Sequence, residues 1–433
     1  MRKLFLLSIA ALGALAVTAT ANADLVIKIT QGVNQPTPVA VAPFAWNGPG
    51  GASPVDVAGV ISSDLARSGL FSPLPDSKML SHPNADSPVN FTNWKAVSVN
   101  DLVVGSIDVT GQTAQIRFRL FNVYTGQQLL GYSLPARTDD LRFAAHQIAD
   151  KVYQKLTGTP GAFATRIAYI KKEGTGKGSK WELIVADSDG ANAQTVVKSS
   201  QLLMSPTFSP TGSKIAYVQF EHDASHIYIQ DIATGKRKIV LNRPGINSSP
   251  AFSPDGSELA LVLSTRPGDP DIYLLNLATN KLRQITHSPA IDTEPAWMPG
   301  GKSLIFTSDR GGSPQLYEMA LNGSGKAQRI TWNGSYNARA AVSPDGKSVA
   351  LVHRENGALK IALLDLASGN MTLLTNGPTD VSPSFAPNGA MILYSTGSGD
   401  QRKLATVSVD GKVREELSGS AGAYSQPIWG NIP

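Results

Sequence analysis

Histidines and nucleophile motifs are the first places in this sequence where chemistry could be expected. The chain has six histidines, and only His222 and His226 lie close together. Their spacing would place two metal ligands on one face of a helix, but the flanking residues are β-rich and indicate a hairpin. Neither a G-x-S-x-G nucleophile elbow nor an H-E-x-x-H zinc motif occurs. We therefore expect no catalytic residues and no metal-binding residues.

Two glycine-rich segments are candidates for cofactor sites. The segment Gly174–Ser179 loosely resembles a phosphate-binding loop. In that loop the lysine precedes a serine or threonine that ligates magnesium, whereas Lys177 precedes Gly178. A hairpin turn explains this segment better, and Asn47–Gly51 is expected to be a flexible loop. The sequence therefore predicts no cofactor.

The first residues carry a targeting pattern. Arg2 and Lys3 precede an apolar run that begins at Leu4, and the small-residue sequence 21–23 (Ala-Asn-Ala) follows it. This order is typical of a secretory signal peptide. The apolar run is shorter than the ~20 residues that a membrane-spanning helix needs. We predict that residues 1–23 are removed, that Asp24 begins the mature chain, and that the protein is exported without membrane insertion.

The composition narrows the function further. Cysteine is absent, which excludes disulfides, thiolate chemistry and the lipid-bearing cysteine of a bacterial lipoprotein. The formal net charge is +5, and it falls by two when the signal peptide with its two cations is removed. This weak charge, without a long run of lysine or arginine, predicts no nucleic-acid partner.

A repeated signature dominates the second half of the chain. Its first proline, or Ala340 in its place, falls at positions 206, 250, 295, 340, 383 and 427, so the period is 43 to 45 residues. The copies span Ser205–Gly212, Ser249–Gly256, Glu294–Gly301, Arg339–Gly346, Ser382–Gly389 and Gln426–Gly430. Each unit reads as four short strands separated by glycine-containing turns, which is the period of a β-propeller.

The two ends of the repeat region complement each other. The run Arg166–Ile170 looks like the second strand of a unit but has no signature before it, and the last signature has no unit after it. The C-terminal strand 426–430 would therefore complete the blade that begins at residue 166, which removes exposed strand edges. We predict a mainly β protein whose residues 161–433 form a six-bladed propeller with four-stranded blades, closed by the C-terminal strand.

Residues 24–160 lack the repeat and predict a small α/β domain. Ser53 is expected to cap a helix with Pro54 in its first turn and an apolar face that ends before Gly69. A second helix is expected from Leu141 to Leu156, ending at Gly158. Predicted strands are Val39–Ala42, Leu102–Val109, Thr113–Val123 and Gln127–Leu134, and the linker to the propeller is Gly158–Gly161.

An arm at 24–34 precedes this domain. Its start alternates apolar and polar residues: Asp24, Leu25, Val26, Ile27, Lys28, Ile29 and Thr30. The alternation fits an edge strand equally well as an arm that docks onto a partner by strand addition.

The segments just before each signature begin the innermost strands and are expected to surround one mouth of the central channel. They are polar, small and mixed in charge, which suits a peptide or protein partner. The candidate residues are Met204, Ser205, Asn247, Ser248, Ser249, Asp292, Thr293, Glu294, Asn337, Arg339, Asp380 and Ser382. An alternative is a small ligand or a metal ion in the channel, for which Asp292, Glu294 and Asp380 are the candidate carboxylates.

The order of signal peptide, α/β domain and propeller with x-P-x-F-S-P-D-G signatures resembles the TolB family, and the segment Asp292–Trp297 strengthens the resemblance. The resemblance covers the whole mature chain. It implies a periplasmic, non-catalytic scaffold of the Tol-Pal system of Gram-negative bacteria, needed for outer-membrane integrity and cell division. An accessory propeller of a hydrolase would predict a nucleophile motif, which is absent.

The resemblance also implies two protein partners. The propeller mouth, at positions matching Ser249 and Thr293, would bind the peptidoglycan-associated lipoprotein Pal. The N-terminal segment from Asp24 would bind the inner-membrane protein TolA, with its order coupled to Pal binding. At position 246 this chain has isoleucine, where the resemblance leads us to expect the polar histidine of enterobacterial members.

We expect the protein to be a monomer.

Overall fold

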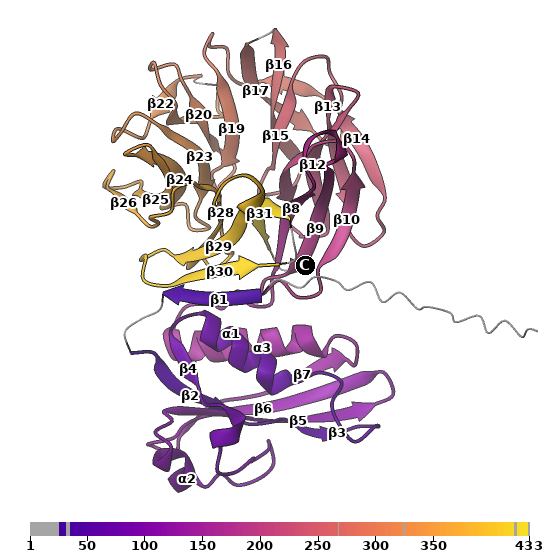
Figure 1. The fold of residues 1–433 in the computed structure, drawn as a ribbon, viewed down its shortest axis with the longest axis vertical. Coiled ribbons are helices and arrows are strands. Elements are labelled where there is room, and N and C mark those ends of the chain that lie inside the picture. Colours follow the sequence, from indigo (N-terminus) through magenta and orange to yellow (C-terminus); the bar gives the residue numbers. More distant parts are fainter. Residues whose placement is uncertain (1–25, 32–34, 267, 324, 420–421, 432–433) are drawn as a thin grey trace, which may run out of the picture.

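The computed structural model describes residues 26–31, 35–266, 268–323, 325–419 and 422–431 (Figure 1). The predicted signal peptide at 1–23, with Asp24 and Leu25 of the arm, lies outside the described residues. Two bodies follow one another along the chain, an α/β domain and a propeller (Figure 1). Among the described residues, no helix combines the length and apolar character needed to cross a membrane.

The N-terminal domain is a mixed sheet in the order β4-β2-β5-β6-β7, with β3 pairing β5. The long strands β5, β6 and β7 form an antiparallel meander, while β2 pairs with β4 and β5 in parallel. The predicted strands and helices are all present. Their bounds are β2 Thr37–Val41, β3 Ala45–Asn47, α1 Val57–Arg67, β4 Phe71–Pro73, η1 Asp76–Lys78, α2 Phe91–Ala96, β5 Asp101–Thr110, β6 Thr113–Asn122, β7 Gln128–Arg137 and α3 Leu141–Thr157.

Helices α1 and α3 bury their apolar faces in the same core as one face of the sheet. Ile61 of α1 and Ile148 of α3 are fully buried in this core, together with Ile116 of β6. Burying such a side chain stabilises the fold by ~1.5–3 kcal/mol. The opposite face of the sheet packs around Trp94 of α2. The periodicity of each helix therefore identified the face that meets the sheet.

The cap of α1 differs from the sequence prediction. Asp56, not Ser53, is the N-cap residue, and its Oδ1 accepts a hydrogen bond from the Gly59 amide at 2.9 Å. The Ser53 hydroxyl instead donates to the Val55 carbonyl at 2.6 Å. The helix begins at Val57 because an aspartate directly before the first turn satisfies an amide that the helix itself leaves unpaired.

The propeller has six blades, as predicted. Each blade is an antiparallel sheet whose strands follow one another outward from the channel. The strands are β8 Arg166–Glu173, β9 Lys180–Asp187, β10 Gln194–Ser199, β11 Leu203–Phe208, β12 Lys214–Glu221, β13 Ala224–Asp231, β14 Arg237–Leu241, β15 Asn247–Phe252, β16 Glu258–Arg266, β17 Asp269–Asn276, β18 Leu282–Gln284, β19 Asp292–Trp297, β20 Ser303–Ser308, β21 Gln315–Ala320, β22 Ala327–Arg329, β23 Asn337–Val342, β24 Ser348–Glu355, β25 Ala358–Asp365, β26 Met371–Leu373, β27 Asp380–Phe385, β28 Met391–Thr396, β29 Lys403–Ser408, β30 Arg414–Ser418 and β31 Ala423–Gly430. Short 3₁₀ turns lie at Gly176–Gly178 and Gly399–Gln401.

The predicted ring closure is confirmed. Strand β31 is the innermost strand of the blade that contains β8, β9 and β10, and it pairs antiparallel with β8. The indole of Trp429 in β31 donates to the Thr165 hydroxyl at 2.8 Å, just before β8 begins. The two ends of the repeat region are thus joined by one sheet.

The arm strand β1 (Val26–Gln31) belongs to the propeller, not to the N-terminal domain in which the sequence placed it. It pairs antiparallel with β30 as a fifth strand of the sixth blade, with Ile29 opposite Glu415. Figure 1 shows β1 running between β30 and the two helices α1 and α3. In the structure, therefore, the arm is an edge strand, which was one of the two alternatives.

Candidate partner-binding mouth of the propeller

The six innermost strands share one backbone distortion close to their first residues. The residue before the first signature proline, or before Ala340, has a positive φ between 48° and 59° in every blade. These six residues, here called the throat ring, are Ser205, Ser249, Glu294, Arg339, Ser382 and Gln426. Such angles cost non-glycine residues free energy and persist where the surrounding structure imposes them, often at binding sites.

The distortion breaks the pairing between the innermost strand and its neighbour. In the blade of β11, Met204 is opposite Val218 and Thr207 is opposite Ala216, so Ser205 and the proline after it leave the regular ladder. Proline lacks the amide hydrogen that a ladder bond needs, and it is tolerated here because this position lies outside the ladder. The throat ring and the residues that follow it line an open cavity of about 210 Å³ on the channel axis.

Throat-ring side chains from adjacent blades are linked to one another by hydrogen bonds. The Glu294 carboxylate accepts from Arg339 Nε at 2.7 Å and from the Arg339 amide at 3.0 Å. Arg339 Nη1 in turn donates to the Ser382 hydroxyl at 2.5 Å. These contacts cross two blade boundaries, so the ring presents a polar surface whose geometry is fixed before any partner arrives.

Four of the predicted mouth residues are buried inside their own blades. Asn247, Asp292, Asn337 and Asp380 occupy equivalent positions at the first residue of their strands, and none is more than 1% exposed. The sequence reading placed them at the mouth surface. The structure differs because these side chains turn into the blade and bind the loops beside it.

Each of the four has specific internal partners. The Asn247 amide donates to the carbonyls of Ser225 and Arg243, and both carboxylate oxygens of Asp292 accept from Arg310. In the next two blades, the Asn337 amide donates to Gln315 Oε1, and Asp380 accepts from the Thr396 hydroxyl and the Gly377 amide. They stabilise the loops around the mouth.

All the other predicted mouth residues are partly exposed, and all except Met204, Ser248 and Thr293 line the cavity. They are Met204, Ser205, Ser248, Ser249, Thr293, Glu294, Arg339 and Ser382. The sequence reading omitted Gln426, although its position in the last signature marks it as the sixth member of the throat ring. Ile246, which the sequence analysis noted for its departure from histidine, is exposed directly before Asn247, and Ile291, which the sequence prediction did not include, is exposed directly before Asp292.

The acids considered for a channel cation already have partners. Glu294 is paired with Arg339, and Asp292 is paired with Arg310. Asp380 accepts two hydrogen bonds from its own blade. These three carboxylates do not converge on one point in the channel lining, because only Glu294 is among the cavity residues.

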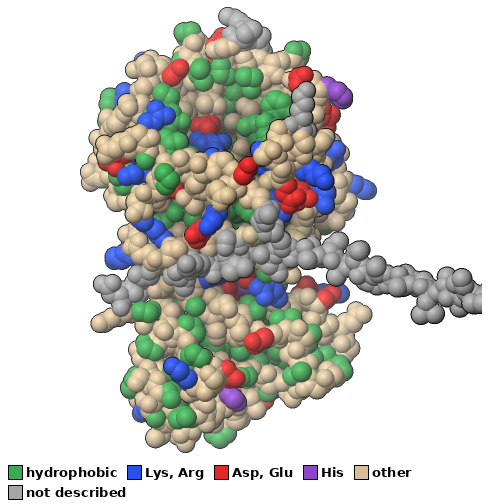
Figure 2. Space-filling model, in the orientation of Figure 1, with side chains coloured by type: hydrophobic (Ala, Val, Ile, Leu, Met, Phe, Trp, Pro, Cys, Tyr) green, Lys and Arg blue, Asp and Glu red, His purple; other side chains and the backbone are tan. Residues whose placement is uncertain are grey.

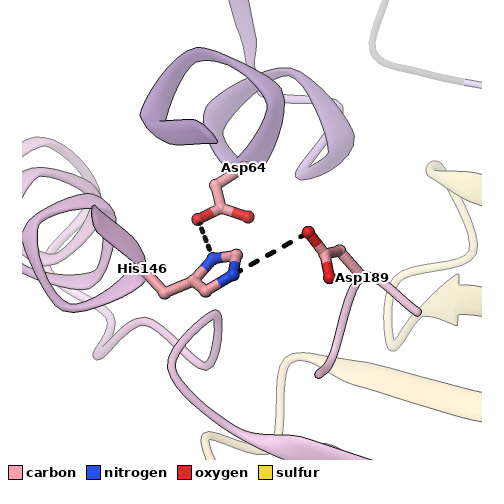
Figure 3. A group of neighbouring side chains, drawn as sticks. All are labelled: Asp64, His146 and Asp189. Carbon is pink, nitrogen blue, oxygen red and sulfur yellow. Dashed lines mark hydrogen bonds and ion pairs between the residues drawn. The ribbon is translucent and has the colours of Figure 1, made fainter. Parts of the chain in front are cut away.

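A cluster with the composition of a metal site lies elsewhere, where the two domains meet. Among the described residues it comprises Asp64, His146 and Asp189 (Figure 3). His146 Nδ1 is already engaged by Asp64, and guanidinium groups of Arg67 and Arg142 bind the two carboxylates. This arrangement leaves too few free donor atoms for the four ligands that zinc usually takes. On the face drawn in Figure 2, the described surface of both domains is a mixture of basic, acidic and apolar side chains.

Comparison with known proteins agrees with this architecture. Residues 153–433 match the TolB beta propeller domain family, and residues 25–129 match the TolB amino-terminal domain family. A Tol-Pal system protein TolB from Thioalkalivibrio sulfidiphilus is 54% identical over 94% of this chain and 94% of its own length. Another from Methylobacillus flagellatus is 53% identical over 96% of this chain and 95% of its own length.

Solved structures show the same relationship. The crystal structure of TolB from Acinetobacter baumannii superimposes with a TM-score of 0.85 at 37% identity, covering 94% of this chain and 99% of that one. A putative TolB from Agrobacterium tumefaciens, at 20% identity and a TM-score of 0.50, covers 60% of this chain and 90% of its own, and shares the fold. With both domains matched along almost the whole sequence, the chain belongs to the TolB family of the Tol-Pal system.

Proposed function

We propose that this protein is a non-catalytic periplasmic scaffold that binds the lipoprotein Pal at the propeller mouth and TolA through the N-terminal segment. In this role it supports outer-membrane integrity and cell division. Membership of the TolB family supports the assignment to the Tol-Pal system. The absence of nucleophile and zinc motifs from the sequence supports a binding role.

The throat ring is the observation that carries the Pal assignment. Its polar side chains are preorganised by bonds between blades, and they surround an open cavity. A rigid polar site loses little conformational entropy when a partner binds, and it can select that partner by hydrogen bonding. We assign the Pal contact to the partly exposed residues of the predicted mouth, and above all to Ser249 and Thr293.

The arm supports the TolA assignment. In its sheet β1 pairs with a single strand, β30, and its other edge faces α1 and α3 (Figure 1), so the segment is held by one strand alone and would leave β30 to pair with TolA. Exposed strand edges pair readily with an extended segment of another chain. Residues Asp24 to Thr30 would then supply backbone hydrogen bonds to TolA. We do not propose a cation or small ligand in the channel, since its candidate acids are paired within the protein.

Calorimetric titration with the periplasmic domain of Pal from the same organism tests the Pal assignment. The wild-type protein 24–433 is compared with Thr293→Arg, which places a long cation at the mouth. Thr372→Arg, on the exposed outermost strand β26, is the matched control. We expect binding by the wild type and the control, and none by Thr293→Arg. Absence of binding by the wild type, or full binding by Thr293→Arg, would overturn the assignment.

A further inference from the structure

The boundary between the two domains is bridged by one buried histidine. His146 of α3 and Asp64 of α1 both belong to the N-terminal domain, and each side chain is 1% exposed. His146 Nδ1 lies 2.6 Å from Asp64 Oδ2. Its other ring nitrogen, Nε2, points toward Asp189 in the β9–β10 loop of the propeller, at 3.8 Å from Oδ2 (Figure 3). The imidazole thus stands between carboxylates of two domains.

Two arginines of the N-terminal domain reach the same propeller loop. Arg67 Nε donates to Asp64 Oδ1 at 3.0 Å, and its Nη2 donates to the Ser188 hydroxyl at 2.7 Å. Arg142 forms an ion pair with Asp189 and lies 3.8 Å from Asp187. The contact between the domains therefore includes a group of buried charges, whose mutual arrangement decides how much they favour the interface.

Acids outnumber permanent cations around His146. Besides Asp64 and Asp189, the nearby carboxylates are Asp187 at the end of β9, Asp150 one turn along α3, and Glu415 on β30, which lies near Arg67 and Asp64. Burial raises the pKa of Glu415 to about 7 and that of Asp150 to about 6, and it also raises the pKa of Asp187. With every acid ionised and His146 neutral, five negative charges face two guanidinium groups, so the interface gains from binding protons.

We propose that this group of residues is a proton-operated latch that holds the two domains in one orientation when His146 is protonated and loosens when it is not. The group, here called the junction latch, comprises Asp64, Arg67, Arg142, His146, Asp150, Asp187, Asp189 and Glu415.

The hydrogen-bonding capacity of imidazole provides the mechanism. Neutral imidazole has a single N–H, so it donates either to Asp64 or toward Asp189, and the other nitrogen is an acceptor facing a carboxylate. In the structure, His146 Nε2 is buried and has no hydrogen-bond partner among the described residues. Protonated imidazole donates from both nitrogens and joins the two domains by charge-assisted bonds. Among side chains, imidazole is the one that commonly exchanges a proton near physiological pH, so pH is the variable that tests the latch.

Förster transfer between dyes on the two domains tests the proposal. The sequence has no cysteine, so Lys95→Cys in α2 and Lys236→Cys beside β14 give two unique labelling sites. We expect the wild-type distribution of transfer efficiency to be narrow at pH 5.5 and broader, with a shifted mean, at pH 8.0. His146→Gln cannot take up the bridging proton but keeps a polar side chain, so it should lose most of the wild-type difference between the two pH values, and only the share due to Glu415 and Asp150 should remain.

Three controls make the result decisive. His82→Gln removes the exposed His82, which pairs with Asp76 away from the junction, and it should respond to pH as the wild type does. Dyes on Lys236→Cys and Lys347→Cys, both in the propeller, should report no pH response. Asp189→Asn removes the propeller carboxylate without altering α3. It should show the same reduced response to pH as His146→Gln, and it replaces that variant as the test if His146→Gln does not fold. An unchanged wild-type distribution, or a wild-type response in both junction variants, would overturn the latch.

Discussion

The amide of Ser205 donates a hydrogen bond to the side-chain oxygen of Gln426 at 2.5 Å, and the two residues are 221 positions apart in the chain. Ser205 belongs to the first complete repeat and Gln426 to the last signature. Their bond crosses the boundary where the C-terminal strand closes the propeller, and it links two members of the throat ring. This one contact therefore contributes both to closure of the propeller and to the shape of its mouth.

Replacing Gln426 by leucine should destabilise the propeller by about 1–3 kcal/mol, because the Ser205 amide loses its acceptor in a partly buried position. Urea unfolding measures the change. Gln201→Leu, in an exposed loop, is the control and should leave the midpoint nearly unchanged. Equal stability of the two variants would show that the Ser205–Gln426 bond does not contribute to closure.

Asn247→Ala and Thr293→Arg should separate structural residues from binding residues. Asn247 is buried and its amide donates to three backbone carbonyls, so its loss should lower the unfolding free energy by about 1–3 kcal/mol. Thr293 is partly exposed at the mouth, so Thr293→Arg should lose Pal binding and keep the wild-type melting temperature. Thermal melts and Pal titrations of both variants check this pair of outcomes.

Glu415→Gln should change how stability depends on pH. Burial raises the pKa of Glu415 from 4.5 to about 7, with Arg67 opposing that rise. The folded protein holds this proton more tightly than the unfolded chain, so the stability due to Glu415 falls as the pH rises from 4.5 to about 7 and stays low above it. The glutamine variant lacks this loss, and it should gain roughly 2–3 kcal/mol over the wild type between pH 4.5 and pH 8.

Urea unfolding of Glu415→Gln at several pH values gives that comparison. Glu416→Gln, at the next position on β30, is a matched control because its partly exposed carboxylate pairs with Lys403 outside the junction. A Glu415→Gln curve parallel to the wild type across the whole range would mean that Glu415 keeps its ordinary titration in the folded protein.

Asp56→Ala should destabilise the N-terminal domain by about 1 kcal/mol, because it removes the side-chain acceptor of the Gly59 amide. Ser53→Ala should cost less, since the Ser53 hydroxyl contacts only the loop before the helix. Chemical unfolding of the two variants distinguishes the caps. A larger effect of Ser53→Ala would support the cap that the sequence suggested.

Deletion of residues 24–31 should abolish binding to the periplasmic part of TolA while leaving the protein folded. The sixth blade keeps its four own strands, β27 to β30, when β1 is removed. Calorimetric titration with TolA measures the loss, and circular dichroism checks the fold. TolA binding that survives the deletion would place the TolA site on another part of the protein.

Much of the architecture could be predicted because it depends on local sequence patterns. The period of 43 to 45 residues fixed the number of blades, and the unmatched run at Arg166–Ile170 predicted closure by the last strand. Turn glycines and apolar periodicity located the strands and both long helices, since these signals depend on neighbours along the chain. The throat-ring residues could be located for the same reason, because each is the first residue of its signature.

Tertiary structure decided what the local patterns leave open. Asn247 and Ser249 are two positions apart and both polar, yet Asn247 is buried in its blade and Ser249 lines the mouth, because the strand leaves its regular pairing after Ser248. The pairing of β1 with β30 joins residues almost 400 positions apart. His146 meets Asp64 and Asp189 only because two domains pack together. Contacts at such separations follow from packing of the whole chain, which no local pattern encodes.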